Sequence, residues 1–191
     1  KSSARLAQDD SSKFGKIIAI NLKTKSSRIY SKGHRNPQGL VWTGNYLLTT
    51  DHGPFGGDEI NNVHAGLNYG WPEASYGENY DYLEKRGPYF YKKKHAGYGY
   101  KEPVYAFVPS IGISQIEKIP DEFSSRWDNS YFVSSLNGKK LFRTIFDAEF
   151  TRVISFESIF VGQRIRDLVY DKGATAFILV LEWPGTLGIL R

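Results

Sequence analysis

Short apolar runs rich in β-branched and aromatic residues, separated by glycine, proline and polar residues, recur along most of the chain. Such runs are typical of β-strands, because β-branched and aromatic side chains pack well on a pleated sheet. The pattern predicts strands at residues 15–22, 27–31, 39–43, 46–50, 59–63, 103–108, 115–119, 130–135, 141–146, 153–156, 165–170, 176–181 and 187–190. Gly44-Asn45 is suited to the two-residue turn of a hairpin between two of these strands.

Helical periodicity is poor throughout, and only residues 121–125 suggest a short helical turn. Residues 1–14 are polar and predict a loop or tail. Residues 73–101 are rich in Tyr, Gly and Lys without a clear period, which indicates a long irregular insertion of the type that carries function or is mobile. The chain is therefore predicted to be all-β.

An internal echo refines this prediction. The segment Gly39-Leu40-Val41-Trp42 with the strand after it resembles Asp167-Leu168-Val169-Tyr170 with the strand after it. Their separation is close to three repeats of roughly 43 residues, the length of one four-stranded propeller blade. The echo and the number of strands favour a β-propeller over a β-sandwich. At that period, 191 residues provide about four blades.

Composition narrows the function classes. The absence of Cys excludes disulfides, thiolate metal sites and a cysteine nucleophile. No apolar run approaches the ~18 residues that a membrane span needs, so no span is predicted. The net charge of +5 comes from scattered residues without a nucleic-acid-binding motif, so no nucleic-acid partner is expected. The four histidines do not fall at metal-site spacings, and no phosphate-binding or dinucleotide-binding glycine pattern is present.

The densest group of polar residues and glycines lies at residues 33–72. Arg35 has a planar, permanently charged side chain that suits a carboxylate or a quinone oxygen. Asn36 and Gln38 flank Pro37 and can present amide groups in a fixed geometry. These residues either contact a ligand or cap a turn between strands.

The segment Gly53-Pro54 is of interest for its backbone. Proline after glycine holds an extended turn that can direct carbonyl oxygens outward, and calcium accepts such ligands. Asp58 and Glu59 add carboxylates nearby. The spacing does not fit an EF-hand loop, so these residues form either a calcium site assembled from distant segments or a solvated acidic turn.

Arg164 and Arg166 alternate at the start of a predicted strand, which places them on one face with Ile165 opposite. Two guanidinium groups side by side repel each other unless an anion lies between them. The pair indicates an anionic ligand, unless Asp167 or a surface carboxylate serves instead.

Several motifs together closely resemble the glucose/sorbosone dehydrogenase family, which are soluble quinoprotein sugar dehydrogenases. They are Gly33-His34-Arg35-Asn36-Pro37-Gln38-Gly39, His52-Gly53-Pro54, Gly57-Asp58-Glu59-Ile60-Asn61, Gly66-Leu67-Asn68-Tyr69-Gly70-Trp71-Pro72 and Arg164-Ile165-Arg166-Asp167. The resemblance implies a six-bladed β-propeller that binds pyrroloquinoline quinone (PQQ) and calcium. It also implies that residues 1–191 form one partial propeller that lacks the N-terminal blades.

The resemblance assigns roles to individual residues. Arg35, Asn36 and Gln38 match the quinone contacts of the family, and Arg164 and Arg166 match its paired cofactor-binding arginines. Gly53 and Pro54 match the backbone ligands of the calcium ion that polarises the quinone. A second, structural calcium ion of some members is implied at Glu59, Tyr69 and Glu102.

Two departures from the family pattern bear on activity. Asn137 stands where glucose-oxidising members have a lysine, although Lys139 or Lys140 could substitute. The catalytic histidine of the family lies on a strand that precedes this chain, and none of the four histidines matches it. No catalytic base is therefore expected within these residues.

The resemblance implies oxidation of an aldose sugar, with hydride transfer from the anomeric carbon to the quinone and onward transfer to an external electron acceptor. It also implies a periplasmic or extracellular protein. The alternative is a non-catalytic extracellular binding module with the same fold. An incomplete propeller exposes strand edges that can pair with another chain, so we expect a homo-oligomer.

Overall fold

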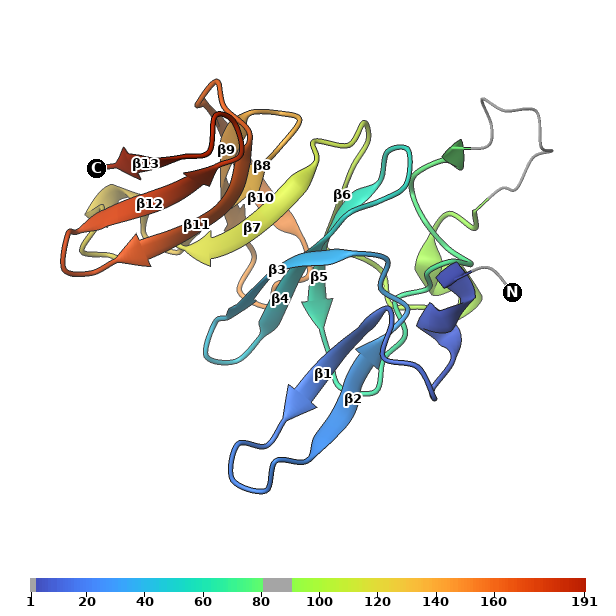
Figure 1. Cartoon of the computed structure of the whole chain (residues 1–191). Coiled ribbons are helices and arrows are strands. Elements are labelled where there is room, and N and C mark those ends of the chain that lie inside the picture. The colour runs from blue at the N-terminus through green and yellow to red at the C-terminus, as the bar shows by residue number, and fades with distance from the viewer. Residues whose placement is uncertain (1–2, 81–90) are drawn as a thin grey trace.

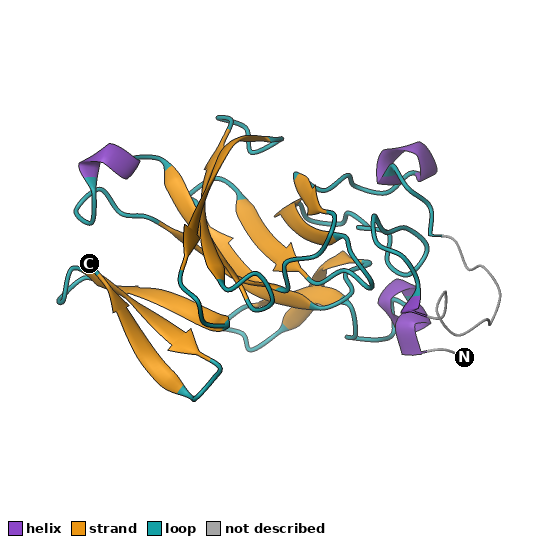
Figure 2. Cartoon of the chain, turned by 90° about the horizontal axis from the view of Figure 1, so that it is seen from above, coloured by secondary structure: helices purple, strands orange, loops and turns teal. Residues whose placement is uncertain are grey.

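The computed structural model describes residues 3–80 and 91–191, and most of its regular structure is strand (Figures 1 and 2). β1 (Lys16–Ile20) pairs with β2 (Ser27–Lys32). The second sheet has the order β3 (Pro37–Trp42), β4 (Leu47–Asp51), β5 (Asp58–Val63) and β6 (Tyr105–Phe107). The third contains β7 (Ile113–Lys118), β8 (Ser130–Ser135), β9 (Lys140–Phe146) and β10 (Val153–Phe160). The fourth contains β11 (Ile165–Asp171), β12 (Ala176–Leu181) and β13 (Thr186–Leu190).

Each predicted strand has a counterpart in the structure, and all paired neighbours within the sheets run antiparallel. The predicted turn at Gly44 is present, with φ of 98° at this glycine. The two echoing segments form the first hairpins of two sheets, β3–β4 and β11–β12. The prediction of an all-β chain is confirmed.

Short 3-10 helices account for the differences. The predicted helical turn at 121–125 lies slightly later, at Ser125–Trp127, and another turn occupies His95–Tyr98. The prediction of a plain tail at 1–14 is wrong at Ser3–Gln8, which is helical. The Lys16 ammonium group donates hydrogen bonds to the carbonyls of Leu6 and Ala7, each at 2.9 Å, and so ties this turn to β1. Residues 81–90 of the predicted insertion lie outside the described residues.

The four sheets follow one another from the N-terminus to the C-terminus (Figure 1). The first strands of three sheets, β3, β7 and β11, lie side by side. Ser114 of β7 links the other two sheets, because its hydroxyl donates to the Ile165 carbonyl at 2.6 Å and its carbonyl accepts from the Thr50 hydroxyl. One edge of three sheets is therefore held together by buried polar contacts.

The three larger sheets pack together through two hydrophobic cores. The first contains Leu48 and Ile60 of the second sheet together with Ile116 and Val133 of the third. The second lies between the third and fourth sheets and includes Phe132, Leu141, Ile165, Leu168 and Phe177. β8 is buried on both faces, because alternate side chains enter opposite cores.

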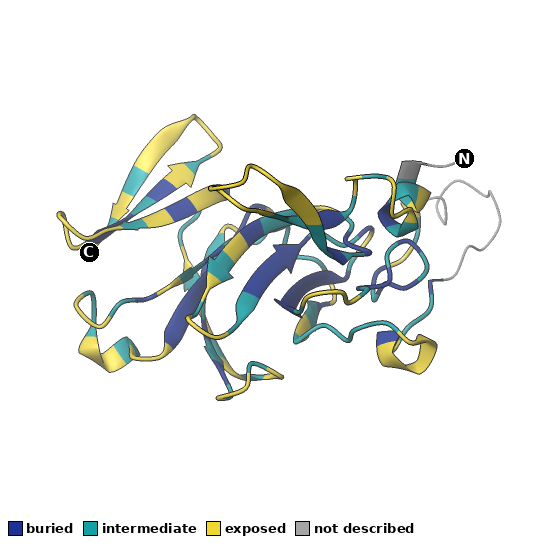
Figure 3. Ribbon diagram, turned by 90° about the horizontal axis from the view of Figure 1, so that it is seen from below, coloured by how far each residue is buried: buried dark blue, intermediate teal, exposed yellow. Residues whose placement is uncertain are grey.

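Burial decreases toward the end of the chain (Figure 3). On β11–β13 the side chains of Val169, Val180, Leu187 and Ile189 are exposed. The sheets do not close into a ring among the described residues. None of the helices in the described part of the chain is long and apolar enough to cross a membrane.

Candidate functional site

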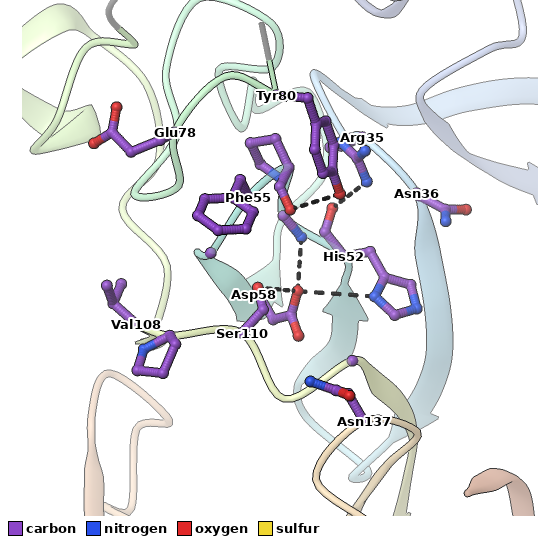
Figure 4. Close-up of a pocket in the computed structure, with 15 residues that line it drawn as sticks. Arg35, Asn36, His52, Phe55, Asp58, Glu78, Tyr80, Val108, Ser110 and Asn137 are labelled. Atoms are coloured by element: carbon purple, nitrogen blue, oxygen red, sulfur yellow. Dashed lines mark hydrogen bonds and ion pairs between the residues drawn. The ribbon is translucent and has the colours of Figure 1, made fainter. Parts of the chain in front are cut away.

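A cleft of about 780 Å³ opens beside the segments that lead into β3 and β7 and the turns that follow β4 and β8 (Figure 4). Arg35, Asn36 and the 52–56 segment form one wall, and residues 108–110, Gly112 and Asn137 form the other. Phe55, Tyr80, Val108 and Pro109 add apolar surface. This volume lies within the range of small-molecule sites, and polar groups converge on an otherwise apolar space.

A buried carboxylate holds the Arg35–Asn36 segment in place. The backbone N–H groups of Arg35 and Asn36 donate to the two oxygens of Asp51 at 3.0 and 2.6 Å. Asp51 is only 4% exposed, so these are charge-assisted bonds in a protected environment. The entry to β3 is thus fixed by the end of β4.

The Arg35 side chain borders the cleft. Its guanidinium donates to the His52 carbonyl at 3.1 Å and lies 5.3 Å from the Trp71 ring centroid, a cation–π contact. Arg35 therefore has an ordered position while it remains partly exposed. The Asn36 side chain is exposed and accepts a hydrogen bond from Gln38 at 3.0 Å.

Behind this segment lies an arrangement that the sequence did not suggest. The Ser31 hydroxyl is 2.8 Å from His34 Nε2, and His34 Nδ1 is 3.6 Å from Asp51 Oδ2. All three residues are buried, and the His34 ring stacks on Tyr69. A serine buried in this way cannot reach a substrate, so the trio supports the Arg35–Asn36 segment.

The turn at Gly53-Pro54 is closely packed. A Cβ atom on Gly53 would lie 2.1 Å from the Gly56 carbonyl oxygen, so only glycine fits there. The Pro54 carbonyl accepts a hydrogen bond from Tyr80 at 3.0 Å. Both residues line the cleft beside Arg35. Any cation at the Pro54 carbonyl would share it with Tyr80.

Asp58 and Glu59 are both buried, so the alternative of a solvated acidic turn is wrong. Burial by itself would raise the pKa of Asp58. The nearby His52 ring and the hydrogen bonds from the Ile113 amide, the Ser110 hydroxyl and the Gly53 amide outweigh burial, so the pKa of Asp58 lies below its ordinary value.

Glu59 behaves in the opposite way. Burial first, and then the nearby charges of Asp51, Glu102 and Asp58, raise the pKa of Glu59 well above its ordinary value, against a lowering bond from Asn61. His95 Nε2 lies 3.6 Å from Glu59 Oε1 but makes no hydrogen bond in the structure.

The predicted second metal set is brought together in part. Glu59 and Tyr69 border the same small cavity. The Tyr69 hydroxyl is already engaged, because it donates to the Asn62 carbonyl at 2.7 Å and accepts from the His64 amide at 2.9 Å. Glu102 accepts hydrogen bonds from the Tyr76 hydroxyl and the Ala96 amide. Within the described residues, no group of three or more His, Asp or Glu side chains is arranged to hold a metal ion.

The paired arginines lie on one face, and Ile165 between them is buried. Both contact the Glu182 carboxylate, so a surface carboxylate occupies the position between them. Arg166 Nη1 also lies 3.5 Å from Gln38 Oε1, at the limit of a hydrogen bond. Arg35, Asn36, Gly53 and Pro54 line the cleft, whereas Gln38, Arg164 and Arg166 do not. Asn137 lines it as well, and Lys139 and Lys140 do not.

The family model for glucose/sorbosone dehydrogenases matches residues 1–188. The chain belongs to this family. Among its relatives, aldose sugar dehydrogenase YliI of Escherichia coli K12 is 31% identical over 169 residues, which are 84% of this chain and 43% of that protein. Quinoprotein glucose dehydrogenase B of Acinetobacter calcoaceticus is 33% identical over 141 residues, 64% of this chain and 26% of that protein. The chain spans less than half the length of these curated relatives.

Solved structures agree with this membership. A glucose dehydrogenase crystal structure superposes with a TM-score of 0.83 at 26% identity, covering 100% of this chain and 58% of that chain. The PQQ-bound aldose sugar dehydrogenase of Streptomyces coelicolor gives a TM-score of 0.73 at 25% identity, covering 99% and 55% of the two chains. The predicted propeller fold is confirmed, and the number of blades stays a prediction.

Proposed function

We propose that this chain is the cofactor-binding part of a PQQ- and calcium-dependent aldose dehydrogenase. The observation that carries the proposal is the cleft, which Arg35, Asn36, Gly53 and Pro54 line together although they come from two separate turns. The names of the relatives, an aldose sugar dehydrogenase and a quinoprotein glucose dehydrogenase, supply the substrate class. A PQQ-bound structural neighbour supplies the cofactor class.

The chemistry of the cleft fits a planar anionic quinone. Arg35 offers a permanent positive charge with an ordered position, and Asn36 offers an exposed amide beside it. Phe55, Tyr80 and Val108 offer apolar surface for flat rings. Arg164 and Arg166 would contribute to the same ligand once Glu182 yields its place between them.

The 53–54 turn fits a hard cation, because its packing fixes the backbone and its carbonyls are oxygen ligands. We assign the calcium that polarises the quinone to Gly53 and Pro54, and a second, structural ion to Glu59, Glu102 and the backbone of Tyr69. The crowding of Glu59, Asp51 and Glu102 supports the second site, since a cation would offset their mutual repulsion.

When bound, the quinone supplies a two-electron acceptor for the hydride of the sugar's anomeric carbon. Arg35 holds positive charge beside the cleft, where negative charge on the cofactor would develop. The Asp51 carboxylate holds the backbone N–H of Arg35, and the backbone carbonyl of His52 holds its guanidinium group. The proton of the sugar hydroxyl requires a base from outside this chain.

The rest of the assignment follows from this role. Residues 1–191 form one partial propeller, the substrate is a sugar, electrons leave to an external acceptor, and the protein is periplasmic or extracellular. The exposed apolar side chains on β11–β13 support self-association of the chain when it is studied alone.

The test is aldose oxidation by the protein that contains this chain, assayed in the presence of PQQ and calcium. Reduction of an artificial dye measures the rate. Arg35→Ala is expected to lower kcat/KM by about a hundredfold through the loss of a charge-assisted contact. Arg28→Ala, at an exposed position of β2, is the matched control and should retain activity. Wild-type protein that binds the quinone without oxidising any aldose would instead favour a non-catalytic binding module.

A further inference from the structure

Asp58 lines the cleft and joins three segments that meet there (Figure 4). It lies at the start of β5, it is 1% exposed, and its donors come from the preceding turn and from the segment that leads into β7. Neither the sugar class nor the predicted cofactor contacts assign it a role.

Each oxygen of Asp58 accepts two hydrogen bonds. Oδ1 accepts from the Gly53 amide at 3.0 Å and from the Ser110 hydroxyl at 2.8 Å. Oδ2 accepts from the Ile111 and Ile113 amides at 3.1 and 2.9 Å. The His52 ring is also near, with Nδ1 3.8 Å from Oδ1. An ionised carboxylate suits these four donors, because both of its oxygens accept and neither carries a proton.

These bonds fix the width of the cleft. Gly53 belongs to the wall formed by the 52–56 segment, and Ser110 belongs to the opposite wall. A single carboxylate therefore connects both walls and sets the position of the Gly53 backbone relative to the third sheet. Glycine at this place has no side chain of its own to fix the turn.

We propose that Asp58 is a positioning residue for the calcium site, acting through the backbone of Gly53 and Pro54. The proposal rests on the proposed function, because it concerns the carbonyl groups assigned there to calcium. The protein already fills the acceptor positions of Asp58, so Asp58 would act on a bound ion by holding the turn and not as a ligand.

Asp58→Asn separates this role from general stability. An asparagine amide has one accepting oxygen and one donating nitrogen. The Ile111 and Ile113 amides can only donate, so they keep the oxygen. The Ser110 hydroxyl can rotate and accept from the new NH₂ group. The Gly53 amide can only donate and is left facing another donor, so the substitution releases the turn selectively.

The experiment combines amide hydrogen exchange without calcium and calorimetric titration with calcium. In Asp58→Asn we expect the Gly53 amide to exchange about tenfold faster, and the Ile111 and Ile113 amides to stay within about threefold of wild type. Calcium affinity should fall by about tenfold. Glu78→Gln removes the same charge from the same cleft, but Glu78 is exposed and paired with Lys93, so its affinity should change by about twofold.

Unchanged exchange at Gly53 in Asp58→Asn would overturn the proposal. An equal loss of calcium affinity in Glu78→Gln would also overturn it, because the loss of one negative charge from the cleft would then explain both results. If Asp58→Asn does not fold, Ser110→Ala tests the same link, with Gly53 exchange expected to rise by about threefold. A third outcome is that Asp58→Asn speeds exchange at Gly53 but the wild type binds no calcium. This outcome would overturn the proposed function and the calcium role of Asp58, and it would leave only the link between Asp58 and the Gly53 backbone.

Discussion

Asp58 and Glu59 are adjacent in β5 and both buried, yet donor groups surround Asp58 and other carboxylates surround Glu59. Asp58 faces N–H and O–H donors from both cleft walls, and its pKa is lowered despite burial. Glu59 faces other carboxylates, and burial together with these charges raises its pKa. Because alternate residues of a strand face opposite sides, one step along the chain separates two environments.

The difference indicates what each carboxylate is for. A buried anion whose lone pairs are filled by the protein has no need of a cation and serves structure. A buried anion among other anions is stabilised by a cation that the protein must acquire. Asp58 is accordingly a positioning group, and Glu59 is the better candidate for a metal ligand.

The largest expected effect concerns stability. Asp58→Ala leaves the four donors around it without their acceptor and creates a cavity between two sheets. The free energy of unfolding should fall by about 4 kcal/mol, in the range for breaking a buried charged network. Urea unfolding measures this loss. A change below about 1 kcal/mol would mean that the bonds to Asp58 carry little of the fold.

Glu59→Gln should have the opposite effect in calcium-free protein at pH 7, raising the free energy of unfolding by about 1 kcal/mol. The folded-state pKa of Glu59 lies above its ordinary value of 4.5. The wild type therefore loses stability as the pH rises from that value through the folded pKa, and the variant lacks this loss.

Calcium provides the control for this prediction. It should raise the melting temperature of the wild type more than that of Glu59→Gln, because the ion offsets the repulsion that the variant has already lost. Equal shifts in both proteins, or a variant that is less stable than wild type without calcium, would remove Glu59 from the second metal site.

A third carboxylate extends the comparison to the surface. Glu182 is paired with Arg164 and Arg166, and their hydrogen bonds lower its pKa. If these arginines bind the cofactor, Glu182 competes with it, and Glu182→Gln should strengthen quinone binding a few-fold, most clearly at low ionic strength. Titration at two salt concentrations measures the change. Weaker binding in the variant would show that Glu182 assists the ligand.

The strands could be predicted in detail because residues that are close together in the sequence specify each strand and turn. The unbroken apolar run of β12, the turn at Gly44 and the β-branched residues of β1 each specify a strand or its end. The helical turn at Ser3–Gln8 could not be predicted, because it depends on Lys16, which reaches back from β1.

The site was predictable to the extent that a motif contains it. Arg35, Asn36, Gly53 and Pro54, which the motifs single out, line one cleft, and their roles toward a ligand stay predictions. The roles of Asp51 and Asp58 were not visible, since their partners are backbone amides from other turns, which no residue pattern records. The occupation of the Arg164–Arg166 pair by Glu182 depends likewise on pairing between β11 and the segment after β12.

The central claim is that this cleft binds a quinone together with calcium. Calorimetric titration of the protein with PQQ tests it directly, when it is done once in the presence of calcium and once in the presence of a chelator. The account predicts saturable one-to-one binding that needs calcium and weakens by at least about tenfold in Arg35→Ala. Absence of binding, or binding that is equal with the chelator and in Arg35→Ala, would contradict it.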